Sequence, residues 1–236
     1  MFLQKIGKKL KKFMTMENEK KKLLKIFSSF PKNIKILDVG CGYGQKIELF
    51  RKSDFNDIVG VEINEAIVKK NQERNIECYV PDDLDKNFKD EYFDVILMSH
   101  VIEHFSPHEL RVFLEKYLKF LKKGGSLIIA TPTMTNLFYV DFDHVRPYDP
   151  NGLNMFFSDD SQMQFYSKHK MNLEDLYFRR SPFRLKNFKS LYVRKNSSVI
   201  LRRIPGLINI ILIIIFKISG GFIGRVSGWI GEFKKM

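Results

Sequence analysis

The chain has 236 residues, which suffices for one α/β domain of generous size and excludes two large ones. Hydrophobic residues make up 44% of the chain and aromatic residues 14%, so a sizeable core can be buried and wholesale disorder is excluded. The formal net charge of +13 resides in the two ends: Met1–Lys25 carries 9 Lys and 2 Glu (+7), Arg179–Met236 carries 13 basic residues and 1 Glu (+12), and Ile26–Phe178 carries 18 basic and 24 acidic residues (−6).

This charge distribution bears on the partners of the protein. A nucleic-acid enzyme usually carries basic residues around its active site, where phosphates dock, whereas basic ends on an acidic middle favour flanks that touch an anionic membrane surface. The two cysteines, Cys41 and Cys78, form neither a secreted disulfide framework nor a C-x-x-C metal site, and the lysine-rich start lacks the apolar run of a signal peptide. We therefore expect a cytoplasmic protein, peripheral at the inner face of the membrane, and do not expect a nucleic-acid partner.

The first predicted region, residues 1–30, consists of basic helices. Phe2, Ile6, Leu10 and Phe13 recur near helical spacing with lysines between them. This pattern is typical of an amphipathic helix that lies on a membrane surface, or of one that packs its apolar stripe on the protein's own core. A second helix is predicted to end at Pro31.

A regular alternation of strands and helices follows. Strands rich in Ile, Val and Leu that alternate with amphipathic helices favour a parallel sheet covered on both faces. The predicted strands are Ile34–Gly40, Asp57–Ile63, Ile76–Val80, Tyr92–Ser99 and Ser126–Pro132, and the predicted helices are Gly44–Ser53, Asn64–Arg74 and Ser106–Lys123, the last ended by Gly124 and Gly125. The sequence thus predicts an α/β, Rossmann-like, doubly wound and mostly parallel sheet, in which ligands bind at the carboxyl ends of the strands.

Beyond Pro132 the pattern becomes irregular. Residues 133–160 are expected to form a loop or lid followed by a short helix. Leu173–Ser181 and Ser190–Lys195 are expected to form an antiparallel pair at the sheet edge. The main domain is accordingly predicted to span residues 31–200.

Residues 201–236 are predicted to form an apolar and basic segment outside that domain. Leu207–Phe216 is apolar except for Asn209, and it is shorter than the ~20 residues that a transmembrane helix needs. Basic residues flank it on both sides. This favours an interfacial anchor on a membrane over a helix buried against the sheet or in a dimer.

A glycine loop directly follows the first predicted strand. ILDVGCGYGQ places Asp38, Gly40, Gly42 and Gly44 between a strand and a helix, where glycines let the backbone turn tightly and approach a ligand. Glu62 ends the next strand, where a carboxylate can accept hydrogen bonds from both hydroxyls of a ribose. The spacing G-x-G-x-G departs from the dinucleotide fingerprint, and an acidic residue before the loop suits a cationic nucleoside better than a pyrophosphate.

Together with PDDLD, YFDVILMSHVIEHF and LKKGGSLIIATP, these motifs make Ile34–Pro132 resemble the class I S-adenosylmethionine-dependent methyltransferases in order and spacing. The resemblance implies this fold, methyl transfer as the activity and S-adenosyl-L-methionine as the cofactor. The residues that it implies for cofactor binding are Asp38, Gly40, Gly42 and Gly44 around the methionine moiety, Glu62 at the ribose, Asp83 and Leu84 at the adenine, and Ser99 near the sulfonium.

The stretch SHVIEHF and the later DFDHVRPY carry the remaining candidates. If a helix begins at Ser99, His100, Glu103 and His104 fall on one face. Histidine suits the removal of a proton from a hydroxyl acceptor. The predicted catalytic residues are His104, His144 and Glu103, and the predicted substrate-binding residues are His100, Arg146 and Tyr148.

Two interpretations of these residues compete. In the first, DFDHVRPY resembles a lid segment of bacterial methyltransferases that act on sugars, glycan intermediates or lipid-linked small molecules, with Arg146 pairing with a phosphate or carboxylate. In the second, Glu103, His104 and His144 resemble the metal ligands of small-RNA 2′-O-methyltransferases, although His100 stands where that family has its first glutamate.

The charge distribution favours the first interpretation. We expect an O-methyltransferase of polysaccharide biosynthesis, or of another glycan or lipid-linked acceptor near the membrane, without a metal. The alternatives are a metal-dependent 2′-O-methyltransferase acting on RNA ends and a catalytically inactive, membrane-docked adaptor. Intact Gly40, Gly42 and Glu62 disfavour the adaptor.

Overall fold

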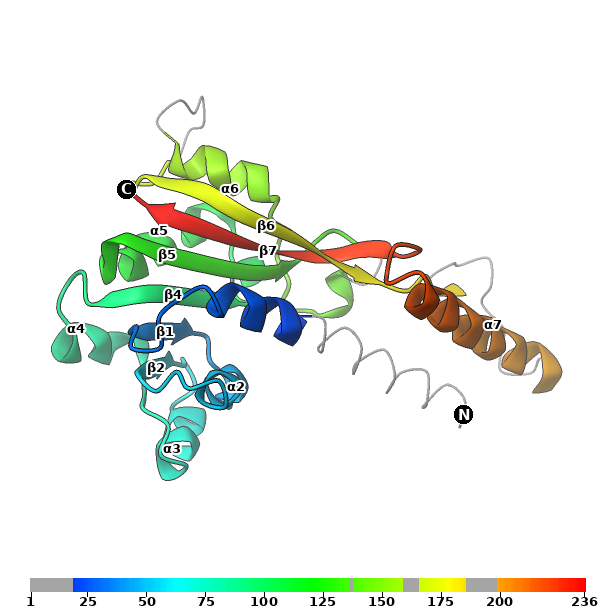
Figure 1. Ribbon diagram of the computed structural model, residues 1–236, viewed down its shortest axis with the longest axis horizontal. Helices are drawn as coiled ribbons and strands as arrows, with labels where there is room; N and C mark the ends of the chain where they lie inside the picture. The colour runs from blue at the N-terminus through cyan, green and yellow to red at the C-terminus, as the bar shows by residue number, and fades with distance from the viewer. Residues whose placement is uncertain (1–18, 136–137, 159–165, 186–198) are drawn as a thin grey trace.

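The computed structural model describes residues 19–135, 138–158, 166–185 and 199–236. Helical residues 19–27 lead into an alternating α/β unit (Figure 1). Its strands are β1 (Ile36–Val39), β2 (Ile58–Val61), β3 (Cys78–Tyr79), β4 (Phe93–Ser99) and β5 (Leu121–Pro132), and its helices are α2 (Gln45–Arg51), α3 (Glu65–Glu73), α4 (Leu84–Asn87) and α5 (Pro107–Leu118). The rest comprises α6 (Pro150–Phe157), β6 (Met171–Ser181), α7 (Val199–Ile218), β7 (Arg225–Lys235) and the short 3-10 helices η1 (Pro81–Asp83), η2 (Ile102–His104) and η3 (Phe138–Val140).

The strands form one seven-stranded sheet in the order β3-β2-β1-β4-β5-β7-β6. Strands β1 to β5 pair in parallel, and β7 pairs antiparallel with both β5 and β6. The predicted doubly wound, mostly parallel sheet with an antiparallel edge pair is confirmed. The strand order reverses between β1 and β4, so the ligand crevice of such a sheet lies at the carboxyl ends of these two strands.

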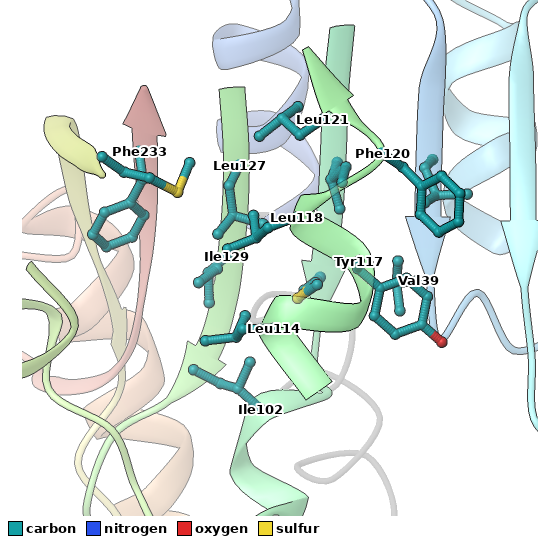
Figure 2. Close-up of a cluster of buried hydrophobic side chains, with 14 of the residues drawn as sticks. Val39, Ile102, Leu114, Tyr117, Leu118, Phe120, Leu121, Leu127, Ile129 and Phe233 are labelled. Atoms are coloured by element: carbon teal, nitrogen blue, oxygen red, sulfur yellow. The ribbon is translucent and has the colours of Figure 1, made fainter. Parts of the chain in front are cut away.

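Both faces of the sheet are buried because successive residues of each strand point to opposite sides. On one face, Leu127 and Ile129 of β5 pack with Leu114 and Leu118 of α5 and with Phe233 of β7 (Figure 2). On the other face, residues in the alternate strand positions pack against residues 19–27, α2 and α3. The near-continuous apolar runs in the sequence arise from this double burial.

Helix α5 begins where the sequence predicts and ends earlier. Ser106 caps it, since its hydroxyl accepts from the Glu109 backbone N–H and the Glu109 carboxylate accepts from the Ser106 N–H. The prediction that the helix continues to Lys123 is wrong, because it stops at Leu118 and β5 begins at Leu121. Phe120 and Leu121 are fully buried, and Leu121 pairs with Phe93 of β4, so core packing overrides their helical periodicity.

The closing strand comes from an unexpected place. Leu173–Ser181 lies within β6 as predicted, but its partner is Arg225–Lys235, and Ser190–Lys195 falls outside the described residues. Residues 201–236 therefore do not all lie outside the main domain, because their last third supplies β7 between β5 and β6. Trp229 and Phe233 of β7 are fully buried, so this strand contributes large side chains to the core.

Helix α7 lies between β6 and β7 in the chain and extends beyond the end of the sheet (Figure 1). Within the described ranges, no helix combines the length and apolar character needed to cross a bilayer. Of the predicted N-terminal helices, residues 19–27 are helical, and residues 1–18 lie outside the description.

Candidate functional site

The glycine loop joins β1 to α2 at the switch in strand order. Gly40 has a φ of 71°, and a Cβ on it would lie 2.5 Å from Cγ2 of Val101, so only glycine fits there. The Gly40 and Cys41 N–H groups both donate to the Val61 carbonyl, which ties the loop to β2. A Cβ on Gly42 would meet no atom within 4 Å, so the space beside this backbone is open to a ligand.

Glu62 lies directly after β2 and faces the loop. Its Oε2 accepts from the Gly42 N–H at 3.0 Å, and its Oε1 accepts from the Asn64 N–H at 3.0 Å. Each oxygen keeps a further lone pair, so the carboxylate can also receive two hydroxyl donors. The predicted ribose-binding residue thus stands beside the predicted loop.

Asp38 is a buried residue of β1, two positions before Gly40 of the same loop. Its side chain is 1% exposed and its Oδ2 has no hydrogen-bond partner. Burial raises the pKa of Asp38 to about 6, and nearby Lys46 opposes this. A buried carboxylate with an unpartnered oxygen fits a cationic ligand group such as an ammonium. Gly42, Glu62 and Asp38 therefore fit S-adenosylmethionine.

Asp83 and Leu84 follow β3, at the same edge of the sheet. Asp83 is half-buried and accepts from the Lys86 ammonium at 2.7 Å, whereas Leu84 is fully buried. Ser99 is the last residue of β4 and is 4% exposed. The topology thus brings all the predicted cofactor residues to the carboxyl edge of neighbouring strands.

Ser99 and His100 meet a residue that the sequence analysis missed. The Ser99 hydroxyl donates to Oε1 of Glu19 at 3.2 Å, and Nε2 of His100 lies 3.0 Å from Oε2 of the same carboxylate. The Arg179 guanidinium forms an ion pair with Glu19 as well. Glu19 is 8% exposed and Arg179 6%, so residues 160 positions apart form a buried ion pair beside the crevice.

His100 lies between two carboxylates. Its Nδ1 is 3.2 Å from Oε1 of Glu103, and Thr131 donates to Oε2 of Glu103 at 2.9 Å. Burial alone would lower the pKa of His100, but the hydrogen bonds to Glu103 and Glu19 outweigh it and raise that pKa. Both ring nitrogens are therefore engaged within the protein. His100, predicted to bind substrate, here links Glu103 to Glu19.

Glu103, His104 and His144 converge in space. Each offers one ligand atom, and these atoms lie within 4.8 Å of one another. Nδ1 of His104 is 3.0 Å from the Asp143 carbonyl, and Nδ1 of His144 is 2.8 Å from the Phe138 carbonyl. A carbonyl only accepts, so each Nδ1 carries a proton, and in a neutral ring each Nε2 then has its lone pair; Nε2 of His144 also lies 3.7 Å from Oδ2 of Asp141. The cluster can therefore take up a proton or bind a divalent cation.

Arg146 and Tyr148 border a cavity, and the Arg146 backbone connects it to Glu103. The Arg146 N–H donates to the Glu103 carbonyl at 3.2 Å, and the Tyr148 hydroxyl donates to the Phe105 carbonyl at 2.9 Å. The cavity measures about 360 Å³ and lies between α5 and α6. Its lining combines Arg111, Arg146 and Tyr148 with the apolar residues Leu110, Leu114, Leu153 and Phe156.

The sequence signals for these residues differ in kind. Glycines, acids and histidines in short motifs reveal the loop, Glu62 and the Glu103 cluster. Glu19 stands among lysines, and Arg179 stands in a predicted edge strand. Neither residue belongs to a local motif. Only the fold, which brings Glu19 and the Arg179 side chain of β6 to Ser99 and His100 at the end of β4, places them at the site.

Comparisons with known proteins agree with this geometry. A family described as methyltransferase domain matches residues 10–181. A tRNA (carboxymethyluridine(34)-5-O)-methyltransferase of Xenopus tropicalis is 31% identical over 43% of this chain and 16% of its own length. The mitochondrial ubiquinone biosynthesis O-methyltransferase of Rattus norvegicus is 33% identical over 45% of this chain and 33% of its own. The chain thus spans a third or less of these two relatives.

A solved structure extends the likeness to the whole fold. A SAM-dependent methyltransferase from Archaeoglobus fulgidus superposes with a TM-score of 0.58 at 22% identity, over 93% of this chain and 94% of that one. The family match covers well over half of the chain. With the doubly wound sheet, the glycine loop and Glu62 in place, the chain belongs to the class I S-adenosylmethionine-dependent methyltransferases.

Proposed function

We propose that this methyltransferase acts on a hydroxyl oxygen of an amphiphilic small molecule, such as a sugar, glycan intermediate or lipid-linked acceptor, at the inner face of an anionic membrane. The observation that carries the proposal is the cavity between α5 and α6. Its apolar lining suits the body of such an acceptor, and Arg111 and Arg146 suit a phosphate or carboxylate on it. The acidic middle of the chain, at −6, favours this acceptor class over RNA.

When bound, the cofactor supplies an activated methyl group on a sulfonium. Asp38 would hold the ammonium group of the cofactor, and Glu62 would hold the two hydroxyls of its ribose. The open space beside the Gly42 backbone would take the part of the cofactor that lies against the glycine loop. His104 is the proposed base, because its Nε2 keeps a lone pair while its Nδ1 donates to the Asp143 carbonyl. The acceptor hydroxyl would lose its proton to this nitrogen as its oxygen gains the methyl group.

The proposal is tested with methyl-labelled S-adenosylmethionine offered to a solvent-extracted membrane lipid fraction and, separately, to total RNA. We expect the label in the lipid fraction. His104→Ala should lower turnover by about 10²-fold or more, the range of a general base, and leave cofactor affinity within about twofold. His108→Ala, on the exposed start of α5, is the control. Label incorporated only into RNA would refute the proposed acceptor class.

A second candidate, a metal-dependent enzyme, is favoured by the Glu103, His104 and His144 cluster. Two imidazoles and one carboxylate suit Mn, Fe, Co or Zn, and both histidines donate their other ring N–H to a backbone carbonyl, as metal-bound histidines usually do. An RNA 2′-O-methyltransferase would be one such enzyme. Elemental analysis of the purified full chain separates the two: stoichiometric metal that is lost in His144→Ala and kept in His108→Ala supports the second candidate.

A further inference from the structure

One side of α7 is apolar and exposed. The side chains of Leu207, Ile211 and Ile218 are 57%, 49% and 82% exposed. Spacings of three and four residues place such positions on one side of a helix. The exposed apolar residues Ile204, Leu207, Ile211, Ile214, Ile218 and Phe222 are called the arm face below.

The opposite side of α7 is held by the protein itself. Ile213 and Phe216 are buried, and the ring of Phe216 packs against Gly221 and Gly224. Oδ1 of Asn209 accepts from the Leu185 N–H at 2.9 Å. One side of α7 is therefore packed against neighbouring residues of the chain, and the arm face is the side left uncovered.

Positive charge accompanies the arm face. Lys217 is exposed within α7, and the Arg180 guanidinium lies 5.8 Å from the centre of the Phe222 ring and donates to the Phe222 carbonyl. From Leu176 to Gly231 the sequence holds 11 Lys and Arg and no Asp or Glu; the side chains among them that the structure describes are those of Arg179, Arg180, Arg184, Lys217 and Arg225. An apolar stripe among cations complements an anionic bilayer, in which apolar side chains enter the interface and cations meet lipid phosphates.

Helix α7, which carries the arm face, projects from the edge of the sheet that carries the site. Ser181 at the end of β6 pairs with Arg225 at the start of β7, and Pro132 at the carboxyl end of β5 pairs with Gly228. Helix α7 therefore connects two strands at the same edge as the carboxyl ends of β4 and β5. In Figure 1 it continues the β6–β7 ribbon beyond this edge.

We propose that the arm face docks on an anionic membrane surface and thereby turns the carboxyl edge of the sheet toward the lipid. The inference deepens the proposed function, on which it rests for the nature of the acceptor, and supplies a partner surface for it. The arm face inserts its side chains along α7 and at Phe222 just beyond it, while Ile213 and Phe216 on the other side stay buried.

Vesicle sedimentation of the full chain tests the inference. We expect binding to vesicles of phosphatidylcholine and phosphatidylglycerol, weakened by salt, and much weaker binding to phosphatidylcholine alone. Leu207→Ser combined with Ile211→Ser should weaken partitioning by about tenfold or more, because apolar area no longer leaves water. Val112→Ser combined with Met155→Ser removes side chains that are 55% and 49% exposed on α5 and α6, and should leave partitioning unchanged.

Three outcomes would overturn the inference. They are an arm-face variant that sediments like the unaltered chain, equal binding to neutral and anionic vesicles, and a vesicle-free dimer that the same variant converts to a monomer. Ile218→Asp, at a side chain that is 82% exposed, provides an independent variant. Methyl transfer to the extracted lipid fraction, measured on the same samples, separates the two proposals: a full chain that labels the lipid fraction but does not sediment with anionic vesicles overturns only this one.

Discussion

Asp38 is a buried carboxylate whose charge is disfavoured until a cation reaches it. Its pKa is raised to about 6 because burial disfavours the ionised form. In the folded chain without ligand, ionisation therefore costs stability as the pH rises from about 4 to about 6. We expect a bound ammonium to reverse this preference, so that cofactor binding would require the ionised carboxylate.

We expect the affinity for S-adenosylmethionine to rise about tenfold between about pH 5 and about pH 7, since roughly a tenth of Asp38 is ionised one unit below its pKa. Calorimetry across this range measures it. Asp38→Asn should bind S-adenosylmethionine more weakly and lose the pH dependence. Asp175→Asn alters an exposed residue of β6 and should keep the pH dependence. A pH-dependent rise that survives in Asp38→Asn would contradict the assignment.

Glu19 joins the N-terminal helix to the site through Arg179 and His100. Burial alone would raise the pKa of Glu19, but the His100 hydrogen bond and the charges of His100 and Arg179 lower it to about 2. A lowered carboxyl pKa contributes stability that is present above its usual value of 4.5 and is lost as the pH falls toward about 2.

Glu19→Gln should therefore destabilise the fold by on the order of 3 kcal/mol at neutral pH. Urea unfolding measures the difference, which should narrow as the pH falls below about 4.5. Glu48→Gln removes an exposed partner of Arg74 and should cost less than about 1 kcal/mol. Equal losses in the two variants would show that the buried network contributes no more than a surface pair.

Residues that act through a local motif could be predicted from the sequence. Gly40, Glu62 and Glu103 stand in short motifs whose residue types and spacing indicate their chemistry. The structure brings all three to one edge of the sheet. Glu19 could not be predicted, since nothing near it in the chain distinguishes it from the surrounding lysine-rich helix. The contacts of His100 could not be predicted either, because its two carboxylate partners are visible only in three dimensions.

At the scale of elements, strand β7 shows why apolar periodicity is an incomplete guide. RVSGWIGEFKK contains two glycines and four charged residues, and it follows an apolar helix with basic flanks. It therefore resembles the end of an anchor. The contacts of Trp229 show that β7 belongs to the core of the sheet. The Trp229 ring is fully buried, and its Nε1–H donates to the Tyr148 carbonyl at 2.8 Å.

Trp229→Ala should destabilise the protein by about 3–5 kcal/mol, the range for a large aromatic side chain removed from a core. Denaturant unfolding followed by circular dichroism measures this loss. Phe178 is the register partner of Trp229 on β6 but is 53% exposed, so Phe178→Ala is the matched control and should cost much less. A loss below about 1 kcal/mol for Trp229→Ala would argue against β7 as an interior strand.

At the scale of the whole molecule, the sheet and the α7 arm are separable although the chain interleaves them. Strand β6 enters the arm at Ser181, and β7 returns from it at Arg225, its register partner. Neighbouring antiparallel strands can be joined by a two-residue turn. We therefore expect the carboxyl edge of the sheet to need β7 but not the residues between β6 and β7.

Two altered chains test this division. A chain truncated after residue 200 lacks β7, so it should fail to fold and should not bind S-adenosylmethionine. A chain in which Asn-Gly replaces residues 182–224 keeps all seven strands and should retain its thermal unfolding midpoint within about 10 °C, because the removed helix buries few side chains on the sheet. The excised chain should bind cofactor like the full chain and no longer sediment with phosphatidylglycerol vesicles. Cofactor binding by the truncated chain would show that β7 is dispensable, and its loss in the excised chain would show that the fold also needs the arm.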